Sequence, residues 1–87
     1  MFELGQVVAT PAALAILEEN GLGYSALLYR HQSLESVELD DEDRQANLNA
    51  VKNGERILSR YTVNGTKLYV ITEWDRSVTT LLLAEEY

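Results

Sequence analysis

His31 is the single histidine of the chain and the one side chain that could serve as a general base near neutral pH. A nucleophilic site would also need a serine or threonine beside that imidazole, and a metal site would need several converging ligands. The sequence has no nucleophile-elbow context, no phosphate-binding glycine pattern and no calcium-binding loop. We interpret His31 as a helix-end residue that either faces the helix macrodipole or packs beside Leu27. We expect no enzymatic activity, no catalytic residue, no cofactor and no metal.

Acidic residues gather in one stretch of nine positions: Glu35, Glu38, Asp40, Asp41, Glu42 and Asp43. One interpretation is structural, because Asp40 can cap a helix whose first turn favours negative charge. The other is functional: the run forms a docking patch for a basic surface on a protein partner, where charge speeds association and steers orientation. The sequence leaves both open.

Trp74 and Arg76 form a second candidate surface beside a predicted turn. A tryptophan there either covers the core or lies exposed. If it is exposed, it and Arg76 are the residue types that dominate binding energy at protein interfaces.

Composition limits the chain to one domain, residues 1–87, with 46% hydrophobic residues. The net charge of −7 and the scattered basic residues argue against direct binding of nucleic acid. Cysteine is absent, which excludes disulfides and thiolate metal sites. Neither a signal peptide nor a membrane-spanning stretch is evident, so we expect a cytoplasmic protein that does not contact membranes.

The first helix is expected over residues 11–19, because Thr10 can cap it and Pro11 suits its first position. Asn20 and Gly21 end it. Its apolar face is expected to comprise Ala13, Leu14, Ile16 and Leu17.

A shorter helix is predicted over residues 24–31 and a third over 41–53, ended by Gly54. The inward positions predicted for these two helices are Tyr24, Leu27, Leu28, His31, Leu48 and Val51.

The last third of the chain changes to an alternating pattern. Asn64-Gly65 predicts a two-residue type I′ turn between strands at 56–63 and 67–74, with Arg56 opposite Glu73. A third strand is predicted at 78–83, followed by an exposed tail. The predicted fold is α+β: two or three N-terminal helices followed by a three-stranded antiparallel β-meander.

One face of this meander should pack on the helices. The opposite face carries Leu58, Tyr69 and Ile71 among charges, and is too apolar to be simply solvated. We therefore expect either a helix or another molecule on it, and a homodimer formed through the sheet is one possibility.

Four segments give the chain a resemblance to a family of small acidic proteins encoded on bacterial plasmids, integrative elements and phages: residues 5–11, 30–33, 40–47 and 71–80. The resemblance spans nearly the whole chain and implies no catalytic residue. The chain departs from the family at residues 34–37, where members carry Gly-Asp-Trp, and at Ala84, where they carry proline.

The resemblance implies an accessory protein of a mobile genetic element. With the acidic run, it leads us to expect a non-enzymatic protein-binding factor, such as an inhibitor of a host defence system of the CRISPR or restriction type. The alternative is a small structural or regulatory homodimeric module.

Overall fold

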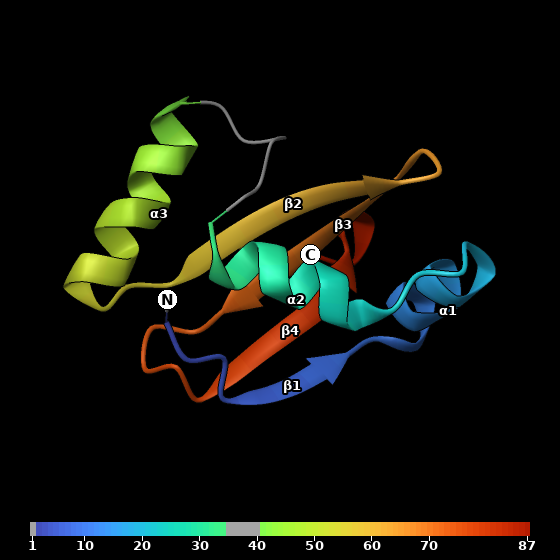
Figure 1. Ribbon diagram of the computed structural model, residues 1–87, viewed down its shortest axis with the longest axis horizontal. Helices are drawn as coiled ribbons and strands as arrows, with labels where there is room; N and C mark the ends of the chain where they lie inside the picture. Colours follow the sequence, from blue (N-terminus) through green and yellow to red (C-terminus); the bar gives the residue numbers. More distant parts are fainter. Residues whose placement is uncertain (1, 35–40) are drawn as a thin grey trace.

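The computed structural model describes residues 2–34 and 41–87, which form a four-stranded sheet with helices on one face and at its ends (Figure 1). The strands lie in the order β1-β4-β3-β2. The elements in chain order are β1 (Gln6–Ala9), α1 (Pro11–Glu19), α2 (Tyr24–Gln32), α3 (Asp41–Asn53), β2 (Ile57–Val63), β3 (Thr66–Thr72), β4 (Val78–Leu83) and the 3₁₀ turn η1 (Ala84–Glu86).

The α+β class is confirmed, but the sheet is not a three-stranded antiparallel meander. Strand β1 precedes the helices and pairs in parallel with β4, which makes the sheet four-stranded and mixed. The main-chain amides of Gln6 and Thr10 donate to the oxygens of Ser77 and Leu81. Sequence pattern does not identify this pairing, because a strand of four residues carries too little periodicity to indicate its partner.

The hairpin between β2 and β3 matches its predicted register at every pair. Asn64 and Gly65 adopt φ values of 48° and 81°, as a type I′ turn requires. Tyr61 lies opposite Leu68, and Arg56 forms a 3.2 Å ion pair with Glu73 just beyond the paired residues. The strands begin or end one or two residues away from the predicted limits.

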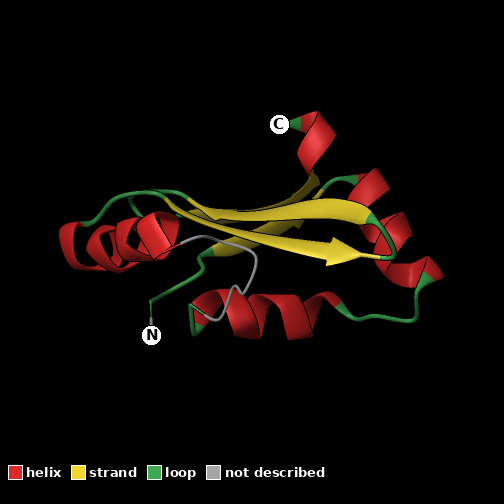
Figure 2. Cartoon of the chain, turned by 90° about the horizontal axis from the view of Figure 1, so that it is seen from above, coloured by secondary structure: helices red, strands yellow, loops and turns green. Residues whose placement is uncertain are grey.

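Helices α1 and α2 cover the inner face of the sheet, as Figure 2 shows for α2. The hydroxyl of Thr10 caps α1 by accepting from the amide of Ala13 at 3.1 Å, as predicted. Two predicted inward positions are wrong: Leu14 and Tyr24 are exposed, because each helix buries a narrower stripe than its apolar residues suggest. A second, smaller core cluster contains Phe2, Ala50 and Ile57. The main core cluster is made of Ala13, Leu17, Leu27, Leu28, Tyr61, Val63, Leu68, Val70, Leu81 and Leu83.

Helix α3 has the predicted limits but is rotated relative to the prediction. Leu48 is 52% exposed and Val51 is half-buried, whereas Asn47 and Ala50 are the buried positions. The reason is polar. The side chain of Asn47 donates to the main-chain oxygen of Leu58 at 2.6 Å and accepts from its amide at 3.2 Å. Strand β2 is at the edge of the sheet, so these main-chain groups of Leu58 have no neighbouring strand to bond. Asn47 supplies their hydrogen-bond partners.

The C-terminal residues fold back instead of forming a free tail. Glu86 accepts hydrogen bonds from the hydroxyl of Thr10 at 2.7 Å and from the amide of Leu83 at 2.8 Å, and these bonds lower the pKa of its carboxyl. The ring of Tyr87 contacts Tyr69 edge-to-face on the outer face of the sheet. The outer face, opposite α2, therefore receives this C-terminal turn (Figure 2).

Candidate functional site

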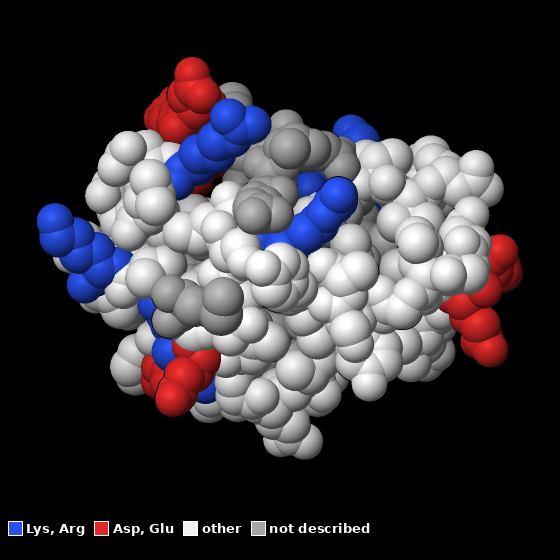
Figure 3. Space-filling model, in the orientation of Figure 1, with Lys and Arg blue, Asp and Glu red and all other residues white. Residues whose placement is uncertain are grey.

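The predicted acidic surface is described only in part. Asp41, Glu42 and Asp43 lie in the exposed first turn of α3, where the helix dipole favours them. Glu35, Glu38 and Asp40 lie outside the described residues. Figure 3 shows acidic and basic side chains side by side at this end of the molecule, and the carboxylate of Asp41 is 3.7 Å from the guanidinium of Arg44. Part of the negative charge is therefore balanced locally.

Trp74 lies in the β3–β4 connection and is 66% exposed. Of the two interpretations that the sequence left open, the lid over the core is therefore wrong. Its neighbours in the chain are both carboxylates, Glu73 and Asp75. A large indole is thus presented to solvent between two acidic residues.

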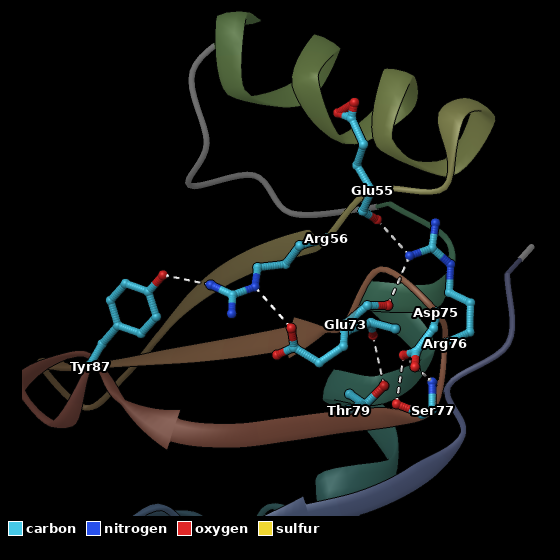
Figure 4. Close-up of polar contacts among 9 residues, drawn as sticks. Glu55, Arg56, Glu73, Asp75, Arg76, Ser77, Thr79 and Tyr87 are labelled. Carbon is cyan, nitrogen blue, oxygen red and sulfur yellow. Dashed lines mark hydrogen bonds and ion pairs between the residues drawn. The ribbon is translucent and has the colours of Figure 1, made fainter.

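Arg76 fixes the conformation of this connection. It adopts a left-handed φ of 60°, which is uncommon outside glycine. Its guanidinium donates to the main-chain oxygens of Glu55 at 2.6 Å and Glu73 at 3.1 Å (Figure 4). It also donates to the main-chain oxygen of Ala50 at 3.0 Å. These bonds join the β3–β4 connection to the C-terminal end of α3, where the carbonyl of Ala50 also accepts from the amide of Glu55. The guanidinium of Arg76 thus bonds to the main chain of its own molecule. Its predicted contact with a protein partner stays a prediction.

Asp75 reinforces the same connection. One carboxylate oxygen accepts from the amide of Ser77 at 3.1 Å and from its hydroxyl at 2.6 Å (Figure 4). These bonds lower the pKa of Asp75, because they favour the charged form. The carboxylate beside Trp74 is therefore both anionic and fixed in position.

The two predicted surfaces do not merge into one site. Arg76 holds the C-terminal end of α3, whereas the acidic turn begins the same helix. A helix of 13 residues is about 20 Å long. A partner would need to span the length of α3 to contact both.

His31 is fully buried at the centre of a polar chain that sequence reasoning missed. Its Nδ1 lies 2.6 Å from the hydroxyl of Ser59, and its Nε2 lies 2.8 Å from that of Thr72. Thr72 in turn lies 2.7 Å from the hydroxyl of Thr79, which donates to the main-chain oxygen of Leu4 at 2.7 Å. Ser59 and His31 form a pair of the kind used in catalysis, but burial keeps this pair from any substrate.

Burial, and to a smaller extent the positive charge of Arg76, together lower the pKa of His31 from 6.5 to about 4. The ring of Phe2 meets His31 edge-on at 5.2 Å, and the guanidinium of Arg76 lies 5.7 Å from the centre of that phenyl ring. The imidazole is therefore neutral at pH 7. The sequence signal for this network was available: Ser59, Thr72 and Thr79 occupy inward positions of three neighbouring strands.

Among the described residues, no three histidine or carboxylate side chains are grouped closely enough to hold a metal ion. A hollow of about 380 Å³ between α3 and the sheet carries carboxylates of Asp43 and Glu55 as well as guanidinium groups of Arg56 and Arg60. Its charges are mixed, so it selects for neither anions nor cations.

Within the described ranges, every helix is too short or too polar to cross a bilayer. Comparisons with protein-family models, curated proteins and solved structures give no match to this chain.

Proposed function

We propose that the chain is a non-enzymatic accessory protein that binds a protein partner with a basic surface, and that the connection carrying Trp74 contacts this partner. The observation that carries the proposal is an indole left 66% exposed on a connection held in place by Arg76 and Asp75. A rigid aromatic side chain of this kind contributes much contact area and loses little conformational entropy on binding.

The chemistry around Trp74 favours a basic partner. Lysine and arginine side chains bind the face of an indole through cation–π attraction. The carboxylate of Asp75, whose pKa is lowered, supplies a fixed negative charge beside it. The net charge of −7 would attract a basic partner over longer distances, and the acidic first turn of α3 would add to that attraction.

The resemblance to proteins of mobile genetic elements supplies a context for this activity. In that context the partner would be a component of a host defence system, of the CRISPR or restriction type, whose nucleic-acid-binding surface is basic. Occupying such a surface inhibits the enzyme without any chemistry by the inhibitor. This target class rests on the resemblance alone.

A capture experiment tests the proposal. Wild-type protein and the variants Trp74→Ala and Asp41→Lys/Glu42→Lys are immobilised, and proteins from a host lysate are quantified by mass spectrometry. We expect Trp74→Ala to weaken capture of the specific partner at least about 30-fold, which is the loss typical of an interface hot spot. The charge variant should mainly slow association and reduce the dependence on salt.

Tyr29→Ala is the matched control, because Tyr29 is a similarly exposed aromatic residue on α2, at 61%. Capture that survives both Trp74→Ala and the charge variant would refute the proposal, as would an equal loss with Tyr29→Ala.

The second candidate function is a structural or regulatory homodimer. In the described part of the chain, no α-helix covers the outer face of the sheet, which favours this reading. However, Ile71 on that face is buried within the chain and Tyr69 is partly covered by Tyr87. Mass measurement in solution over a range of concentrations tests this candidate, and a monomer throughout would exclude it.

A further inference from the structure

The outer edge of β1 is open. Even-numbered residues of this strand bond to β4, as the amides of Gln6 and Thr10 show. The main-chain N–H and C=O groups of Val7 and Ala9 therefore point away from the sheet. No described residue pairs with this edge, and Figure 1 shows β1 as the last strand on its side.

An exposed apolar patch adjoins the edge. A hollow of about 210 Å³ is lined by β1 together with Leu14, Tyr24 and Leu81, and a second of about 240 Å³ shares Leu14 and Tyr24 with it. The exposed large side chains of this patch, which we call the β1 patch, are 38–51% exposed: Val7, Val8, Leu14, Leu22 and Tyr24. All are uncharged, and the single charged residue that lines either hollow is Glu18.

We infer that the β1 patch binds a second copy of this chain, with the two β1 strands pairing antiparallel about a two-fold axis at Val8. An antiparallel pair of identical strands is self-complementary, as a two-fold interface requires. Val7 of one copy would lie opposite Ala9 of the other, so their outward N–H and C=O groups form hydrogen-bonded pairs. The two copies would then share one continuous eight-stranded sheet.

This register is the one that the side chains favour. Val8 faces the outer side of the sheet with its paired residue Thr80, and at the two-fold axis it would contact Val8 of the other copy. On the inner side, the Leu14 and Tyr24 side chains of the two copies would come together. A register with the two-fold axis at Val7 would place Val7 opposite itself. Ala9 would then lie opposite Gly5, which is outside β1.

Charge also points to a second copy. Each copy carries a net charge of −7, so two copies repel one another overall, and the repulsion is smallest where acidic side chains are few, as at the β1 patch with Glu18. A basic partner would gain nothing from an uncharged surface. The five side chains are each 38–51% exposed, so together they would bury on the order of 400 Å² per copy. That is below the ~800 Å² per partner of a standard interface, so the dimer should be reversible.

Sedimentation analysis from about 1 µM to about 1 mM tests the inference. The mass should rise from 9.8 kDa toward twice that value, and dimerisation should be stronger at high salt, because salt screens the repulsion between like-charged copies. Val8→Lys places two ammonium groups face to face and should raise the dissociation constant at least about 30-fold. Leu14→Lys on α1 is a second variant that leaves the strand unchanged and should weaken the dimer in the same direction.

Leu48→Lys is the matched control, since it introduces the same charge at a residue 52% exposed on α3. Hydrogen exchange at the amides of Val7 and Ala9 should slow as the dimer forms. A monomer at every concentration and salt level, an equal effect of Leu48→Lys, or unprotected Val7 and Ala9 amides in the dimer would each overturn the inference. The outcome is independent of the proposed function, because Val8→Lys leaves the Trp74 connection unchanged and Trp74→Ala leaves the β1 edge unchanged.

Discussion

The hydroxyl of Thr79 donates a 2.7 Å hydrogen bond to the main-chain oxygen of Leu4, and this bond sets the direction of every proton in the buried network. The proton of Thr79 is used there, so Thr72 must be the donor to Thr79. Thr72 then accepts from Nε2–H of His31. The remaining ring nitrogen, Nδ1, accepts from the hydroxyl of Ser59. The neutral imidazole therefore carries its proton on Nε2.

This network predicts a loss of stability in mild acid. The pKa of His31 falls from 6.5 in the unfolded chain to about 4 in the folded one, so the folded state binds fewer protons between these values. The contribution is fully present above pH 6.5 and is lost as the pH falls toward 4, by about 3 kcal/mol in total. Urea unfolding at several pH values measures it.

His31→Gln is the control, because glutamine can hydrogen-bond but does not titrate. The variant should lose less stability than the wild type between pH 6.5 and 4, although the carboxylates titrate equally in both. Parallel curves for the two proteins would contradict the prediction, as would an NMR titration that places the pKa of His31 near 6.5 or its neutral proton on Nδ1.

Asn47→Ala should destabilise the protein by about 2 kcal/mol or more, because it leaves the main-chain N–H and C=O of Leu58 without their partner at a partly buried edge. Chemical denaturation measures the change. Asn49→Ala, on the exposed side of the same helix, removes only a solvent-exposed contact with Gln45 and should change stability by less than about 0.5 kcal/mol. Similar losses for both variants would show that the bonds of Asn47 to β2 contribute little.

Gly5→Ala should be among the most damaging single-methyl additions to the chain. Gly5 has a φ of 66°, and a Cβ there would overlap the main-chain oxygens of Arg76 and Ser77. Because those atoms belong to backbone that cannot easily move, we expect a loss of more than about 2 kcal/mol, seen as a lower thermal midpoint.

Gly23→Ala is the matched control, with a φ of −86° and open space around the added Cβ. It should cost at most about 1 kcal/mol, because alanine is a poorer N-cap residue than glycine. If Gly5→Ala were equally mild, the N-terminal segment would not be held against the β3–β4 connection as described.

The hairpin was predictable from sequence because Asn64-Gly65 sets a turn type, and that turn sets the register of every pair along β2 and β3. The pairing of β1 with β4 was not, since it joins residues about 70 positions apart and depends on the helices between them. Local propensity cannot specify such a contact, although it placed both ends of α3 correctly.

The candidate sites were less predictable than the fold. Trp74 is exposed in a connection where Arg76 adopts a left-handed conformation, which no residue pattern encodes for an arginine. Helix α3 is rotated from its predicted orientation because Asn47 faces inward and bonds to the main chain of Leu58. A prediction based on hydrophobicity does not place an asparagine inward. In both places a polar side chain, Arg76 or Asn47, hydrogen-bonds to main-chain groups of another element.

The attachment of α3 has a consequence for how the molecule opens. Polar bonds from Asn47 and Arg76 connect this helix to β2 and to the β3–β4 connection. Its buried apolar residue, Ala50, belongs to a small cluster with Phe2 and Ile57 and not to the main core cluster. Helix α3 can therefore detach as a local unit while the other helices stay packed on the sheet. Its amides should exchange with solvent faster than those of β3, and proteases should cleave α3 in the native protein before they cleave strands β2, β3 and β4.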